Sequence, residues 1–308
     1  MASTWKRRIV SALTRPPRIS VREFLEARAA GRSDIEDTFF WQIRLHSGVF
    51  KATHRRRLDD TFPLLLGAIP VDDSALRVLD VACSSGVSTA ELHCALIARG
   101  LVVETIGTDI LTQVRHVAFR DGSAVLVDRD GNILGAEIRG MLIDRQPSSA
   151  VMIFHPLRVV RSLWLIRSIK GCFAEERLYP PGVKITEVPL ISSNVDMLPK
   201  VRIVEEDILE PKVEGSFGLI RAANILNFSY FAPAKLRELV AALLARLRVG
   251  GLLFIVRSEG TENHGTLWSR QADGLRLLGS VGRGSEISGI VEEVGATLAP
   301  RGAALGPS

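Results

Sequence analysis

The sequence has few cysteines, no metal-binding spacing of histidines and no long apolar run. It contains three cysteines, Cys83, Cys94 and Cys172, and none of them forms a CxxC pair. Three cysteines are too few to cross-link a chain of 308 residues, so we expect a reducing compartment and a cytoplasmic protein. No stretch reaches the ~18 uncharged apolar residues that a membrane span requires. Disulfide-rich secreted proteins and membrane-spanning proteins are therefore not predicted.

The six histidines show no HxxxH or HExxH spacing, so no metal site is expected. Hydrophobic residues make up 46% of the sequence and charged residues 24%, which is typical of a globular protein. The length allows one large α/β domain with additions, or two smaller domains. A substantial core is therefore expected.

The positive charge is concentrated at the amino-terminal end. Residues 1–57 hold 13 Lys and Arg against five Asp and Glu, a net charge of +8, which leaves −3 for the rest of the chain. A basic arm of this kind can meet nucleic acid or an anionic membrane. No aromatic stacking pattern or recognised nucleic-acid motif accompanies the charge. We therefore expect no nucleic-acid partner and interpret the charge as a solvated face.

Residues 1–70 are predicted to form a helical extension. Ser20 and Glu23 have the spacing of a capping box at the start of a helix over 19–30. Residues 34–46 place Ile35, Phe39 and Ile43 at helical spacing, which is typical of a core-facing helix. A lid over a cofactor is the alternative for this segment. A third short helix is expected over 55–66.

The most specific signal is a strand, a turn of small residues and a helix over residues 77–99. The strand is Arg77–Ala82, the helix is Val87–Arg99, and a second strand over 101–109 ends on Asp109. Strand, helix and strand within ~33 residues fit a right-handed βαβ unit. Asp109 is therefore expected at the carboxyl edge of the sheet, beside the first turn.

A long insert follows the second strand. A crossover needs only ~12 residues, yet the next convincing strand begins at Val201. Within 110–200 we predict a hairpin over 123–139, a basic amphipathic helix over 157–173 and an irregular return over 183–199. The helix carries Trp164, so a peripheral membrane contact is an alternative to packing on the domain with its arginines in water.

The sheet is predicted to resume after the insert. Strands are expected at 201–209, 217–224 and 252–256, a helix from Pro233, an antiparallel hairpin over 266–281 and a last helix over 286–294. The predicted fold is α/β, with a Rossmann-like doubly wound and mostly parallel sheet. Residues 71–109 and 201–308 would form its core, and 110–200 a substrate subdomain.

The turn resembles that of class I S-adenosylmethionine-dependent methyltransferases. Asp80-Val-Ala-Cys-Ser-Ser-Gly86 is similar to the family's D-x-G-x-G-x-G loop, with Ala82 and Ser84 in place of two glycines. The resemblance covers roughly 77–109 and 201–295 and implies S-adenosylmethionine as cofactor. It implies that Asp109 binds the ribose hydroxyls and that Asp207 and Ile208 bind the adenine. The implied cofactor-binding residues are Asp80, Ala82, Cys83, Ser84, Ser85, Gly86, Asp109, Ile110, Asp207, Ile208, Ala223 and Asn224.

A narrower resemblance covers residues 217–259. Phe217 to Asn224, Tyr230-Phe231 and Ser258-Glu259 are similar to segments of the chemotaxis receptor glutamate methyltransferases, whose strand reads F-D-x-I-x-C-R-N. Gly218 replaces the acid, and Ala222-Ala223-Asn224 departs from C-R-N. A small-molecule or lipid-like methyl acceptor is therefore our first prediction, and a protein carboxylate the alternative.

Side chains on loops after strand ends are the candidates for catalysis. Tyr230, His264, Asn227 and Glu259 meet this condition, and no single catalytic residue follows from the sequence. Two alternatives from other classes stay open. The first is a nicotinamide-dependent oxidoreductase, which the absence of GxGxxG disfavours, and the second is a non-catalytic interaction module of the same fold. The sequence gives neither the acceptor nor the oligomeric state.

Overall fold

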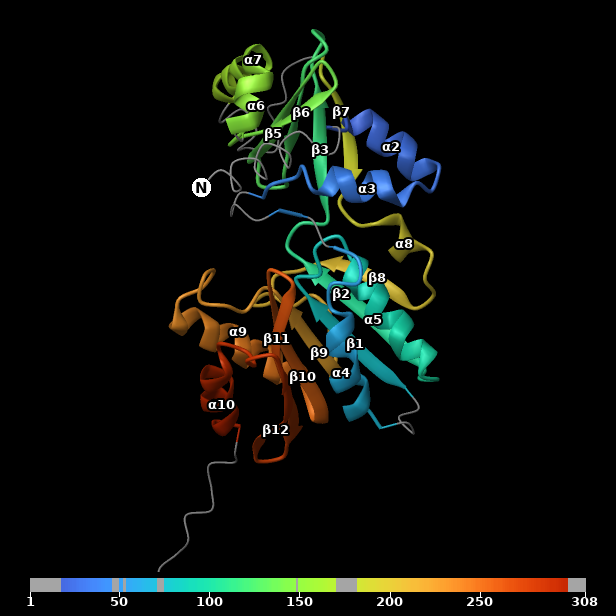
Figure 1. Cartoon of the computed structure of the whole chain (residues 1–308), viewed down its shortest axis with the longest axis vertical. Coiled ribbons are helices and arrows are strands. Elements are labelled where there is room, and N and C mark those ends of the chain that lie inside the picture. The colour runs from blue at the N-terminus through green and yellow to red at the C-terminus, as the bar shows by residue number, and fades with distance from the viewer. Residues whose placement is uncertain are drawn as a thin grey trace, which may run out of the picture. The chain divides into compact units, whose positions relative to one another are not determined.

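The computed structural model describes residues 18–45, 50–51, 54–70, 75–147, 149–169 and 182–298. The chain forms two compact units, Met1–Ala52 with Leu111–Ser193, and Thr53–Ile110 with Asn194–Ser308 (Figure 1). This division differs from the predicted three parts, because the first two helices of the amino-terminal extension join the insert and the third joins the other unit. The basic arm over 1–17 and the predicted helix end at Phe173 lie outside the described residues.

The second unit contains a seven-stranded sheet within its described residues. Its order is β12-β11-β10-β9-β1-β2-β8, and the pairs from β8 to β10 are parallel. The strands are β1 (Leu76–Val81), β2 (Val103–Asp109), β8 (Val201–Glu205), β9 (Phe217–Ala223), β10 (Leu247–Glu259), β11 (Glu262–Gln271) and β12 (Gly274–Val281). Strands β10, β11 and β12 form an antiparallel meander, which includes the predicted hairpin.

Helices cover both faces of this sheet (Figure 1). On one face, α4 (Phe62–Ala68) and α5 (Val87–Ala98) pack against Leu76 and Val78. On the other face, α9 (Pro233–Arg246) and α10 (Ser288–Ala296) pack against Leu79 and Val81. Neighbouring residues of β1 thus face opposite layers, as a strand buried on both sides requires. The predicted doubly wound, mainly parallel α/β sheet is confirmed.

The first unit contains a five-stranded antiparallel sheet within its described residues. Its order is β6-β5-β4-β3-β7. The strands are β3 (Gln113–Ala118), β4 (Ala124–Val127), β5 (Ile133–Ile138), β6 (Met141–Asp144) and β7 (Lys184–Pro189). The predicted hairpin over 123–139 is confirmed as β4 and β5. The predicted irregular return over 183–199 is wrong, because β7 pairs with β3 along its whole length and α8 (Ser193–Asp196) follows.

The amino-terminal helices form part of this unit's core. Helix α2 (Val21–Ala29) has the predicted capping box between Ser20 and Glu23. Phe24 of α2 stacks on Phe39 of α3 (Ser33–Phe40) at 4.1 Å between ring centroids. Both rings are fully buried and pack with Val114 of β3. The interpretation of these aromatics as core residues is confirmed.

Two further helices pack on the opposite face of the five-stranded sheet. Helices α6 (Ser149–Phe154) and α7 (Pro156–Ser168) contribute Val151, Val159 and Ile166 to clusters with residues of β3, β4, β5 and β6.

The third predicted helix, over 55–66, begins later than expected, as a 3-10 turn over Asp59–Thr61 and then α4. Among the described residues, no helix is long and apolar enough to cross a bilayer.

Candidate functional site

The strand order reverses between β1 and β9. From β1 the chain passes through α5 to β2 and later to β8 on one side, whereas β9 passes through α9 to β10 on the other. In an open parallel sheet such a reversal leaves a crevice at the carboxyl ends of the two strands, where ligands bind. The turn at residues 82–86 and the residues after Ala223 lie at these ends.

The turn after β1 has a left-handed backbone at alternate residues. The φ angles are +54° at Ala82, +58° at Ser84 and +77° at Gly86. These are three positions at which the resembled loop carries glycine. A left-handed conformation costs a residue with a side chain roughly 1–2 kcal/mol. The chain therefore keeps the backbone shape of a glycine loop although two glycines are replaced.

Asp109 lies beside this turn, as the βαβ unit predicts. Its Oδ2 accepts a hydrogen bond from the main-chain N–H of Ser84 at 2.8 Å, and the residue is 8% exposed. The main-chain N–H of Cys83 donates to the carbonyl of Thr108 at 2.9 Å. The end of β2 thus fixes the turn after β1 and brings a carboxylate to it. The role of Asp109 in binding stays a prediction.

Asp80 is turned into the protein rather than into the crevice. Its carboxylate accepts hydrogen bonds from Nε and Nη2 of Arg221 at 2.8 and 2.7 Å and from the hydroxyl of Thr89. Asp80 and Arg221 are each 1% exposed. Sequence analysis missed Arg221, although an arginine within the otherwise apolar strand β9 is a signal that a buried partner exists.

Five buried polar atoms near the switch point have no hydrogen-bond partner among the described residues. They are Ser85 Oγ, Arg221 Nη1, Asn224 Nδ2, Arg57 Nε and Glu91 Oε2. Native proteins rarely leave such atoms unsatisfied, so each calls for a partner such as a ligand or a water molecule. Three of the five are N–H donors, one is a hydroxyl and one is a carboxylate oxygen. The crevice therefore offers mainly hydrogen-bond donors to a polar ligand.

The buried Arg221 and the half-buried Arg57 add positive charge on the α5 side of the crevice. Burial lowers the pKa of Arg57, and the nearby charge of Arg221 lowers it further. Burial also raises the pKa of Glu91, one turn into α5, whose Oε1 accepts from the main-chain N–H of Arg56 at 2.7 Å. Helix α5 begins at the same place, with Gly86 as its N-cap. A helix amino end beside arginines favours an anion.

The remaining predicted cofactor residues lie in different surroundings. Asp207 is exposed, and its Oδ1 accepts from the main-chain N–H of Leu209 at 2.8 Å. Ile208 is 8% exposed and packs in the core on the α9 side, whereas Ile110 is 52% exposed. The neighbouring acid Glu206 is buried and paired with Arg246 at 2.7 Å. Ala223 is half-buried at the end of β9.

Asn224 and Asn227 shape the loop after β9. Asn224 has φ +61°, and its Oδ1 accepts from the main-chain N–H of Ser258 at 2.7 Å, which ties the ends of β9 and β10 together. Asn227 is 2% exposed, and its Oδ1 accepts from the main-chain N–H groups of Ser229 and Tyr230. Asn227 therefore holds the turn, while the Tyr230 side chain is 47% exposed.

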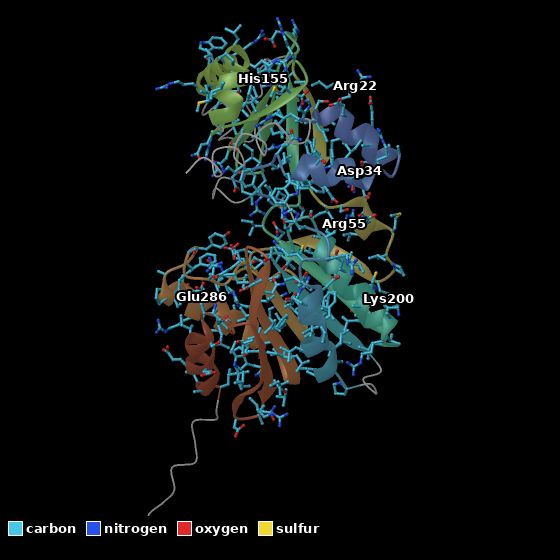
Figure 2. The ribbon with its side chains drawn as sticks, viewed as in Figure 1. Arg22, Asp34, Arg55, His155, Lys200 and Glu286 are labelled. Carbon is cyan, nitrogen blue, oxygen red and sulfur yellow. The ribbon has the colours of Figure 1, made fainter. Side chains whose placement is uncertain are left out.

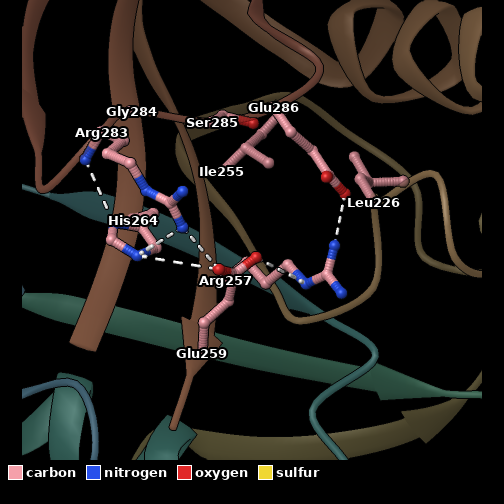
Figure 3. Close-up of a pocket in the computed structure, with 9 residues that line it drawn as sticks. All are labelled: Leu226, Ile255, Arg257, Glu259, His264, Arg283, Gly284, Ser285 and Glu286. Carbon is pink, nitrogen blue, oxygen red and sulfur yellow. Dashed lines mark hydrogen bonds and ion pairs between the residues drawn. The ribbon is translucent and has the colours of Figure 1, made fainter. Parts of the chain in front are cut away.

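The other two catalytic candidates, Glu259 and His264, line one cavity of about 180 Å³ (Figure 3). It lies at the carboxyl half of β10, so it opens at the same sheet edge as the crevice. Sequence analysis missed its remaining lining residues, which are Leu226, Ile255, Arg257, Arg283, Gly284, Ser285 and Glu286. Four of them, 283–286, lie in the loop after β12, and this loop carries no recognisable motif.

Charged groups in the cavity are paired with one another. Arg283 Nη2 lies 2.6 Å from Glu259 Oε2, and Arg257 Nη1 lies 2.6 Å from Glu286 Oε1. His264 accepts at Nδ1 from the main-chain N–H of Arg283 at 3.1 Å, and its Nε2 lies 3.2 Å from Arg283 Nη2. Both ring nitrogens thus face Arg283. His264 supports the Arg283–Glu259 pair rather than presenting a base to the cavity.

No protein-family model and no curated protein matches the chain. Among solved structures, it is similar to the CMeT domain of a citrinin polyketide synthase, with 14% identity and a TM-score of 0.28 over 62% of this chain and 31% of that one. It is also similar to the N-methyltransferase NodS from Bradyrhizobium japonicum WM9 with S-adenosyl-L-homocysteine, with 11% identity and a TM-score of 0.30 over 66% of this chain and 62% of that one. A third similar structure is CalS10, an amino pentose methyltransferase from Micromonospora echinaspora, with 14% identity and a TM-score of 0.33 over 79% of this chain and 83% of that one. The chain thus spans less than two thirds of the first two structures, and likeness at these TM-scores carries no argument about its function.

Proposed function

We propose that the second unit binds S-adenosylmethionine in the crevice between β1 and β9 and transfers its methyl group to a small-molecule or lipid-like acceptor. The observation that carries the proposal is the left-handed backbone at Ala82, Ser84 and Gly86. Glycine adopts this conformation most readily, and the three residues stand at the glycine positions of the class I motif. Asp109 on the Ser84 amide completes the arrangement that the resemblance implies.

The residues at the crevice fit this cofactor. Its carboxylate suits the α5 amino end, where the unpartnered N–H groups of Arg57 and Arg221 and the Ser85 hydroxyl lie. Its ribose hydroxyls suit the Asp109 carboxylate, because one carboxylate accepts several hydrogen bonds. When bound, S-adenosylmethionine supplies a methyl group on a positively charged sulfur that a nucleophile can displace. Binding of the adenine by Asp207 stays a proposal from the resemblance alone.

On the acceptor side, the chain contributes orientation and the exposed carboxylates of Glu259 and Glu286. Holding two reactants in line can account for ~7–11 kcal/mol of a barrier. We infer that Glu259 is the group that takes a proton from a hydroxyl or amine acceptor, because its side chain is 41% exposed in the cavity. Arg283 and His264 hold it in place. Asn227 is engaged in its turn and is not proposed for this role.

Thermal unfolding of the whole chain with two ligands tests the proposal. A ligand that binds only the folded state raises the midpoint of unfolding. We expect S-adenosylhomocysteine to raise it and NADH to leave it unchanged. A shift with NADH alone would favour the nicotinamide-dependent oxidoreductase, and a shift with neither ligand would favour a non-catalytic module. The Glu238→Ala variant is the matched control for Asp109→Ala, because it also removes one acid, an exposed one on α9. It should show the same shift with S-adenosylhomocysteine as the wild type, whereas Asp109→Ala should show a smaller one.

A further inference from the structure

Helices α6 and α7 expose seven large apolar side chains. Leu157 is 84% exposed, Ile153 72% and Trp164 68%, and the others are Met152, Phe154, Val160 and Leu163. We call these side chains the α6–α7 surface. Figure 2 shows side chains of the two helices projecting outward around the labelled His155, which separates them. Many large apolar side chains exposed on two consecutive helices mark a candidate interaction site.

The fold does not need this surface, because α7 is apolar on two opposite sides. Val159 and Ile166 point inward, with the buried Ser162 between them, and pack in clusters with residues of the five-stranded sheet. Leu157, Val160 and Trp164 follow one another at intervals of three and four residues, which places them on one stripe. That stripe lies on the side opposite to the packed one. A partner outside the unit would explain it.

Helices α6 and α7 themselves carry charge of one sign. Over residues 149–168 the sequence contains three arginines and no Asp or Glu. Arg161 and Arg167 are exposed and flank the apolar stripe of α7 on its two sides. Arg161 also pairs with Asp121 of the neighbouring turn at 2.7 Å, with both side chains about half exposed. Cations beside an apolar stripe complement anionic lipid headgroups.

We propose that the α6–α7 surface binds the surface of a bilayer that contains anionic lipids. Apolar side chains would enter the boundary of the acyl chains, arginines would contact headgroup phosphates, and Trp164 would lie at the interface that tryptophan favours. Helix α7 has 13 residues and spans ~20 Å, less than the ~30 Å of a hydrocarbon core. It therefore lies along the interface. This inference is independent of the proposed methyl transfer.

Cosedimentation of the whole chain with vesicles tests the inference. One set contains phosphatidylcholine alone, and the other phosphatidylcholine with phosphatidylserine. We expect binding to the second set, weakened by salt, and at least about tenfold weaker binding for the triple variant Leu157→Ser, Val160→Ser, Trp164→Ser. The matched control replaces three exposed apolar residues of the other unit, Val102, Val249 and Leu277, by serine, and should bind like the wild type.

Two further measurements separate the lipid from other occupants. The Arg161→Gln, Arg167→Gln variant should lose the preference for anionic vesicles, and a blue shift of tryptophan emission on vesicles should disappear in Trp164→Phe. Sedimentation velocity in the absence of vesicles shows whether a second copy covers the surface. No binding to vesicles, equal binding to both sets, an unaffected triple variant, or a dimer that this variant disperses would each overturn the inference.

Discussion

Arg221 on β9 donates two hydrogen bonds to Asp80 on β1, from Nε at 2.8 Å and from Nη2 at 2.7 Å, across the point where the strand order reverses. Both residues are buried, and Arg221 also donates to the hydroxyl of Ser88 at 3.2 Å. The pair joins the floor of the crevice to the first turn of α5. It makes the shape of the crevice depend on two residues that are 141 positions apart in the chain.

Breaking this pair from one side should destabilise the second unit strongly. Asp80→Asn leaves the Arg221 charge buried without a counter-charge, and we expect a loss of about 3–5 kcal/mol in the free energy of unfolding, measured by urea denaturation. The matched control is the exposed pair of Arg237 and Glu293, where Glu293→Gln should change stability little. Equal losses in the two variants would contradict the structural role of Asp80.

Gly86 is the remaining glycine among the three left-handed positions of the turn, and a side chain there should destabilise the protein. Its φ of +77° disfavours any residue with a Cβ, so Gly86→Ala should lower stability by about 1–2 kcal/mol. Gly67 in α4 is the matched control, because its φ is not positive and a Cβ there would meet no atom within 4 Å. Gly67→Ala should raise stability by about 0.5–1 kcal/mol. Chemical denaturation of both variants gives the comparison, and a stable Gly86→Ala would refute the left-handed turn.

Ser85 and Thr89 should respond differently, because only one of their hydroxyls has an internal partner. Ser85 Oγ is buried without a partner among the described residues, so Ser85→Ala should leave the stability of the free protein unchanged or higher. It should weaken binding of S-adenosylhomocysteine. Thr89→Val removes the hydrogen bond to Asp80 and should lower stability by about 1–3 kcal/mol. A destabilised Ser85→Ala with unchanged binding would show that its hydroxyl serves the fold alone.

His93 should make stability depend on pH below neutrality. Burial lowers its pKa from the usual 6.5, so the unfolded chain binds a proton that the folded chain does not. Stability should therefore be complete above pH 6.5 and fall as the pH drops toward the lowered value. In His93→Gln this part of the pH dependence should vanish, while the exposed His155→Gln should keep it. Denaturation midpoints between pH 5 and about 8 test this, and identical profiles for the two variants would be inconsistent with it.

The second unit was predictable because its signals are local. The strand, turn and helix over 77–99 lie in one continuous segment, and the rule for βαβ units is sufficient to predict Asp109 beside the turn. Arg221 was not predicted as the partner of Asp80, because the pairing depends on which strands become neighbours. The cavity was missed for the same reason, since Arg257 and Arg283 come from separate strand ends and carry no motif.

The first unit was predictable in its helices and its hairpin, but not in the way they assemble. Strands β4 and β5 are joined by a short turn that contains Asp130-Gly131, which is a strong hairpin signal. Strand β7 was missed because it is an edge strand with one buried residue of six, and it pairs with β3 across a long stretch of chain. Hydrophobic periodicity appears in a sequence where a strand buries a face, so an edge strand with little burial gives a weak signal for a strand. The joining of residues 18–45 to this sheet likewise depends on contacts distant in sequence.

Calorimetric titration of the whole chain with S-adenosylhomocysteine tests the central claim most directly. The account predicts saturable binding at one site, at least about tenfold weaker in Asp109→Ala, because that variant removes the carboxylate that would accept from the ribose hydroxyls. Circular dichroism should show that this variant is folded, and Glu238→Ala should bind like the wild type. No binding by the wild type, or equal binding by Asp109→Ala, would contradict the account.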